Sequence, residues 1–94
     1  MSKEKELMTF LRERVFDPIL DSKDAPGNIK SGIHLTIARM NRLDAAGMRQ
    51  YYWSALAKDN SIQFSKNLKR LGLPRFEDVL EDFRDKFNDS WLTA

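Results

Sequence analysis

Apolar residues recur along this 94-residue chain at intervals of three or four positions, and no stretch sustains strict alternation of apolar and polar residues. The first spacing places apolar side chains on one side of an α-helix, whereas a half-buried β-strand requires alternation. The pattern therefore predicts an all-α protein. We expect a compact, single-domain bundle of about five short helices over residues 1–94.

Prolines, glycines and polar capping residues set the expected helix boundaries. The first helix should end before Asp17-Pro18, because proline has no backbone N–H and cannot continue a helix without losing a hydrogen bond. Asp17 and Pro18 then look like the cap and first residue of a separate short turn. The helices expected on this basis cover about residues 3–16, 28–43, 45–58, 62–71 and 74–91.

The helix expected over residues 74–91 divides clearly into an apolar side and an acidic side. Its large apolar side chains fall within about 100° of one another around the axis. They are Phe76, Val79, Leu80, Phe83 and Phe87. A cation site on the acidic side would lack the loop that wraps calcium, so we interpret that side as a solvated surface.

The run Tyr51-Tyr52-Trp53 lies inside the helix expected over residues 45–58. Neighbouring residues of an α-helix point about 100° apart, so three successive aromatic side chains cannot share one face. If Tyr52 faces the core, Tyr51 and Trp53 flank it on opposite sides. Either the domain covers both flanking rings, or one of them contacts a partner.

Composition narrows the class of protein. With 41% hydrophobic and 32% charged residues and no cysteine, the chain suits a folded domain without disulfides or thiolate metal centres. No apolar stretch is long enough for a signal sequence or a membrane span. We therefore expect a cytoplasmic protein that does not associate with membranes.

Catalytic and ligand-binding patterns are missing from the sequence. His34 is the only histidine, so no second imidazole or thiolate is available to share a metal ion. The chain contains neither a nucleophile-elbow pattern nor a glycine-rich phosphate loop. These observations predict a protein that is not an enzyme and that has no metal or cofactor.

Charge is distributed unevenly along the chain, although the net charge is only +2. Residues 1–20 are neutral overall, residues 21–75 carry ten basic and four acidic groups, and residues 76–94 carry two basic and six acidic groups. The opposite charges of the last two segments can be satisfied within one monomer or between two copies packed head to tail.

The outer side of the helix over residues 28–43 is the first candidate for a binding surface. Leu35, Arg39 and Arg42 lie within about 60° of one another there, roughly opposite Ile37. A leucine bracketed by arginines is typical of protein interfaces, although a neighbouring helix could equally cover it. We predict a small, non-enzymatic protein–protein interaction module that self-associates as a homodimer. The expected contact residues are Leu35, Arg39, Arg42, Tyr51 and Trp53.

Two alternatives remain open at this point. The basic region over residues 39–75 could bind nucleic acid through its phosphates, which would make the protein a nucleic-acid-binding regulator. Its basic residues are Arg39, Arg42, Arg49, Lys58, Lys66, Lys69, Arg70 and Arg75. The low net charge and the acidic last helix count against this alternative. A small apolar ligand held near Tyr52, Trp53, Phe64 and Phe83 is the second alternative.

Overall fold

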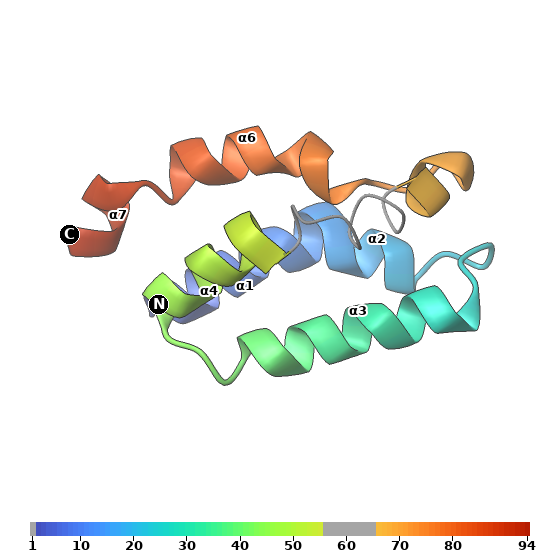
Figure 1. Cartoon of the computed structure of the whole chain (residues 1–94), viewed down its shortest axis with the longest axis horizontal. Coiled ribbons are helices and arrows are strands. Elements are labelled where there is room, and N and C mark those ends of the chain that lie inside the picture. Colours follow the sequence, from blue (N-terminus) through green and yellow to red (C-terminus); the bar gives the residue numbers. More distant parts are fainter. Residues whose placement is uncertain (1, 56–65) are drawn as a thin grey trace.

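A computed structural model describes residues 2–55 and 66–94, and every regular element in these ranges is helical (Figure 1). This confirms the all-α prediction. The elements are α1 (Lys3–Leu11), the π-helical turn η1 (Arg12–Phe16), α2 (Asp17–Leu20), α3 (Gly27–Met40), α4 (Ala45–Gln50), the π-helical turn η2 (Tyr51–Ala55), α6 (Phe76–Lys86) and α7 (Asp89–Thr93). Residues 66–70 are also helical, and the remainder of the helices expected over 45–58 and 62–71 lies outside the described residues.

The continuous segment α1–η1–α2 occupies the middle of the molecule. In Figure 1, α3 runs along one long side of this segment and α6 along the other, while α4 packs against α1. The radius of gyration is 12.9 Å, close to the value of about 13 Å expected for a compact domain of 100 residues. The helices therefore pack around one shared interior.

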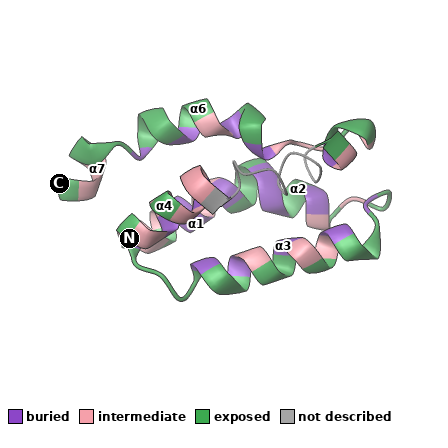
Figure 2. Cartoon of the chain, in the orientation of Figure 1, coloured by how far each residue is buried: buried purple, intermediate pink, exposed green. Residues whose placement is uncertain are grey.

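The core is built from the apolar stripes that the sequence pattern indicates. From α3 it takes Ile29, Ile33, Ile37 and Met40, and from the last part of the chain Phe76, Val79, Phe83 and Phe87. Figure 2 shows these buried positions on the inner sides of α3 and α6. The Phe83 ring has a centroid 4.9 Å from that of Phe87 and 6.2 Å from that of Phe10. The aromatic side of α6 thus packs directly on α1.

Pro18 does not end the first helix, which is a correction to the expected boundary. The backbone stays helical through Asp17 (φ −63°, ψ −42°) and continues to Leu20. The π turn η1 ends at Phe16, two residues before the proline, and the Asp17 N–H donates to the carbonyl of Arg12, five residues back. This wider turn relieves the clash between a proline ring and the carbonyl four residues before it. A single bent helix therefore replaces the predicted helix and separate turn.

The helix expected over residues 74–91 is also interrupted. It ends at Lys86, and Phe87 leaves the helical region with φ −105° and ψ 50°. Asn88 then caps α7, since its side-chain oxygen accepts a hydrogen bond of 2.9 Å from the Trp91 N–H. The cap provides the free amides of α7 with an acceptor, and the break keeps the Phe87 ring in the core.

Gly72 ends the helical segment over residues 66–70, as its position in the sequence predicts. Its φ is 73°, and the N–H of Leu73 donates to the Leu68 carbonyl while the N–H of Gly72 donates to that of Lys69. These two bonds form a Schellman motif, which requires the left-handed conformation at this residue.

Gly72→Ala should therefore lower the free energy of unfolding by about 1–2 kcal/mol, because a Cβ strains the left-handed backbone. Gly27→Ala is the matched control, since Gly27 has an ordinary φ and no atom lies within 4 Å of an added Cβ. The control should be neutral or should raise stability by up to about 1 kcal/mol. Urea denaturation measures both variants. Equal effects of the two substitutions would contradict the role of Gly72.

Candidate interaction surface

The outer side of α3 carries an exposed leucine, which is followed by one arginine on the helix and a second arginine in the turn after it. Leu35 has 51% of its surface exposed, and Arg39 and Arg42 are also exposed. Ile33 and Ile37, two residues to either side of Leu35, are buried, so the helix turns Leu35 away from the core. We call Leu35, Arg39 and Arg42 the α3 ridge. None of the described helices covers Leu35.

The α3 ridge is basic, and the nearest carboxylates in the sequence are Asp24 and Asp44. No aspartate or glutamate occurs between residues 25 and 43. Arg39 and Arg42 form no ion pair with any residue in the described parts of the chain. Both arginines are exposed.

Trp53, by contrast, packs within its own chain. The guanidinium carbon of Arg49 lies 4.6 Å from the centre of the Trp53 ring, and that of Arg84 on α6 lies 5.6 Å from it. Tyr51 is half-buried and also packs against the core. The domain therefore covers both flanking aromatics in part, and their predicted role in partner contact stays a prediction.

The π turn η2 explains how three successive aromatics are accommodated. Hydrogen bonds of a π turn span five residues, so neighbouring side chains diverge by less than the ~100° of an α-helix. Tyr52 takes the innermost position, with 1% exposure, and its hydroxyl donates a 2.8 Å hydrogen bond to the Phe76 carbonyl. Burial raises the pKa of the Tyr52 phenol well above its usual value.

The five predicted contact residues do not form one patch. The α3 ridge lies on the side of the molecule formed by α3, whereas Trp53 contacts Arg84 of α6. Figure 1 shows α6 on the opposite long side of the central helix from α3. Residue spacing within a helix places Leu35 beside Arg39 and Arg42, but it carries no information about which distant helix meets Trp53. No signal in the sequence separates the exposed group from the packed one.

Ion pairs within the monomer neutralise part of the acidic side of α6. Asp82 pairs with Arg14 at 2.9 Å, and Asp89, just beyond α6, pairs with Arg49 at 2.8 Å. Arg75 donates two hydrogen bonds to the Asp78 carboxylate, which lower the pKa of that group. The charge imbalance seen in the sequence is thus satisfied in part between helices of one copy.

Three carboxylates on α6 remain exposed and form no ion pair with a described residue. They are Glu77, Glu81 and Asp85. Because they are spaced four residues apart, they follow one another along a single side of the helix. We call them the α6 ridge. The described part of the molecule therefore presents an unpaired basic ridge on α3 and an unpaired acidic ridge on α6.

Comparison of this chain with protein-family models, with curated proteins and with solved structures finds no match in any of the three. Its function is therefore inferred from its surface and its chemistry.

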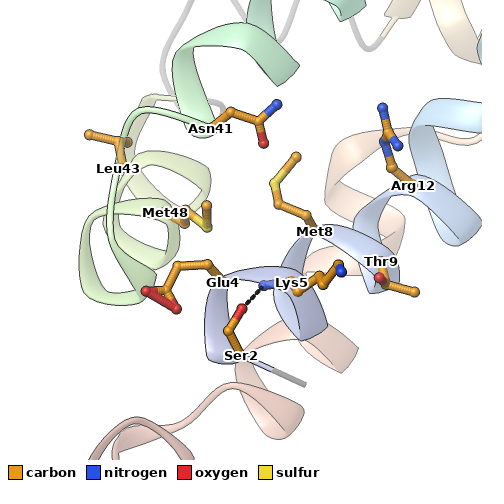
Figure 3. A pocket seen from close by; sticks show the side chains of 9 residues that line it. All are labelled: Ser2, Glu4, Lys5, Met8, Thr9, Arg12, Asn41, Leu43 and Met48. Atoms are coloured by element: carbon orange, nitrogen blue, oxygen red, sulfur yellow. Dashed lines mark hydrogen bonds between the residues drawn. The ribbon is translucent and has the colours of Figure 1, made fainter.

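A pocket of about 420 Å³ lies between α1 and the turn that joins α3 to α4 (Figure 3). Met8 and Met48 are its buried apolar members, and Leu43 is 36% exposed. Its other lining residues are Ser2, Glu4, Lys5, Thr9, Arg12 and Asn41. This lining contains one carboxylate, two cationic side chains and no histidine. Within the described ranges, no group of three histidine, aspartate or glutamate side chains could hold a metal ion.

The pocket lies away from the aromatic residues that the sequence suggested for a small apolar ligand. Two of those residues, Tyr52 and Phe83, pack against each other with ring centroids 4.6 Å apart, which leaves no room for a ligand between their rings. Phe64 lies outside the described residues. Among the described helices, none has the length and apolar character needed to cross a bilayer.

Proposed function

We propose that this protein is a small, non-enzymatic interaction module that self-associates, and that the α3 ridge is its docking surface. The observation that carries the proposal is the 51% exposure of Leu35 beside two arginines without an ion-pair partner among the described residues. Arginine is one of the residues enriched at protein interfaces, and Leu35 adds apolar area beside the two arginines.

The chemistry of the ridge indicates the kind of contact that it makes. Burial of the exposed part of Leu35 supplies a favourable apolar contribution, since a fully buried leucine contributes about 1.5–3 kcal/mol. Arg39 and Arg42 supply charge-assisted hydrogen bonds to carboxylates. A patch of this size yields weak association, because ordering two partners offsets most of the contact energy.

Nucleic-acid binding by the region over residues 39–75 has less support. Arg49 is engaged by Asp89 and Trp53, and Arg75 by Asp78. These are two of the eight basic residues on which the nucleic-acid alternative depends, and both already have acidic partners within the chain. Arg39 and Arg42 on α3 and the exposed Lys66, Lys69 and Arg70 remain.

The test compares two double variants that remove equal charge from different places. Arg39→Gln with Arg42→Gln neutralises the α3 ridge, and Lys66→Gln with Lys69→Gln neutralises two exposed lysines elsewhere. Sedimentation velocity at low ionic strength should show concentration-dependent association of the wild-type protein and of the lysine variant. The arginine variant should associate at least tenfold more weakly.

Two outcomes would overturn the proposal. One is a wild-type protein that stays monomeric at high concentration, and the other is an arginine variant that associates like the wild type. A gel-shift assay with DNA and RNA fragments is run in parallel on all three proteins. Salt-sensitive binding by the wild type that both variants weaken would favour the nucleic-acid alternative.

A further inference from the structure

The α6 ridge has the charge and the spacing that the α3 ridge requires in a partner. Glu81 and Asp85 are one turn of α6 apart, which corresponds to about 6 Å along the axis. Arg39 on α3 and Arg42 in the turn that follows it are three residues apart in the sequence, and both have long, flexible side chains. Each ridge is exposed, and neither has an ion-pair partner among the described residues.

The two ridges cannot meet within one molecule. Helices α3 and α6 lie along opposite long sides of the central helix, and Figure 2 shows exposed positions along the outer edge of each. The short dimensions of the molecule are 22 and 18 Å, far beyond hydrogen-bond distance. A basic ridge on one side and an acidic ridge on the other make each copy complementary to the next.

Building on the proposed function, we infer that the partner of the α3 ridge is the α6 ridge of a second copy of this chain. The contact pairs Arg39 and Arg42 of one copy with Glu81 and Asp85 of the next, and it covers Leu35. A symmetric contact between two α3 ridges would instead bring four guanidinium groups together. Like charges placed opposite each other at an interface disfavour that arrangement.

A contact between two different surfaces has a consequence for the size of the assembly. Each added copy leaves one α3 ridge and one α6 ridge unoccupied, so growth continues unless the assembly closes into a ring. The protein should therefore form a series of oligomers that lengthen with concentration. This differs from the homodimer that the sequence alone led us to expect.

The experiment uses two variants that each lack one ridge. The first carries Arg39→Gln and Arg42→Gln, and the second carries Glu77→Gln, Glu81→Gln and Asp85→Asn. All five residues are exposed, and circular dichroism with thermal unfolding should show that both variants fold like the wild type. Each variant alone should sediment as a monomer, at least tenfold weaker in association than the wild type.

Mixing the two variants is the decisive step. The intact α3 ridge of the second variant should bind the intact α6 ridge of the first, and the neutralised ridges should block any further growth. The mixture should therefore form a 1:1 complex of two chains and nothing larger. Raising the salt concentration should dissociate this complex, because exposed charge pairs are screened.

The possible failures distinguish an error in the head-to-tail inference from an error in the proposed docking role of the α3 ridge. If the second variant associates like the wild type while the first does not, the α3 ridge binds a surface other than α6, and the head-to-tail inference is wrong. The same conclusion follows if both variants are monomeric and the mixture forms no complex. If the first variant associates like the wild type, the docking role of the α3 ridge is itself wrong.

Discussion

Replacement of Tyr52 by alanine should lower the free energy of unfolding by about 3–5 kcal/mol, as is usual for a large aromatic side chain removed from a core. Tyr52 is 1% exposed, and its ring centroid lies 4.6 Å from that of Phe83 and 6.3 Å from that of Phe76. Its removal leaves a cavity between η2 and α6. Because domains are stable by only about 5–15 kcal/mol, urea denaturation should show a much earlier transition.

Tyr52→Phe separates the ring from its hydroxyl. This variant keeps the aromatic packing and loses the 2.8 Å hydrogen bond to the Phe76 carbonyl. A single hydrogen bond of this kind contributes about 0.5–1.5 kcal/mol, so the loss should be a fraction of that caused by alanine. If phenylalanine were as destabilising as alanine, the packing argument would be wrong.

The pH dependence of stability provides a second measurement at Tyr52. Burial raises the pKa of its phenol in the folded protein above the usual value of about 10. The unfolded chain therefore ionises first as the pH rises, and stability that is fully present below about pH 10 is progressively lost above it. Urea titrations of the wild type above that pH should show a steeper loss than those of Tyr52→Phe. Identical pH profiles would contradict a protected phenol.

Ile33→Ala should lower the free energy of unfolding by about 2–5 kcal/mol, whereas Leu35→Ala should leave it within about 0.5 kcal/mol of the wild type. The two residues lie two positions apart on α3, but Ile33 is 0% exposed and Leu35 is 51% exposed. They therefore point to opposite sides of one helix. The pair tests the fold and the docking surface with the same type of substitution.

Self-association should be weakened by Leu35→Ala more than by Ile33→Ala, which is the reverse of their effects on stability. Leu35→Ala removes apolar area from the α3 ridge and should weaken self-association measured by sedimentation while the domain unfolds normally. Ile33→Ala leaves the ridge itself unchanged, so its folded fraction should still associate. A loss of stability in Leu35→Ala equal to that in Ile33→Ala would show that Leu35 belongs to the core.

Local patterning was sufficient for the all-α class and for the inner and outer sides of α3 and α6. Ile33 and Ile37 face inward and Leu35 faces outward because helical geometry fixes side-chain direction over a few residues. The exposure of Arg39 and Arg42 follows from the same rule. Helix boundaries were less predictable. The first helix continues through Pro18 after a π turn, and Asn88 caps a new helix where the pattern indicated a continuous one.

The location of Trp53 and the engagement of Arg49 depended on contacts between distant parts of the chain. Trp53 meets Arg84, and Arg49 meets Asp89, across 31 and 40 positions of sequence respectively. Helical periodicity describes only the direction of a side chain relative to its own axis. It cannot state which helix lies beside that side chain. The sequence therefore could not distinguish Trp53, which packs against α6, from Leu35, which is exposed.

The sequence by itself determined that the chain is helical, which residues of α3 and α6 face the core, and that a basic and an acidic segment exist. Only the tertiary structure decided that α3 and α6 lie on opposite sides of the molecule and that some of their charges are already paired. The physical reason is range: periodicity and capping act within a few residues, whereas the arrangement of ridges depends on how whole helices pack against one another.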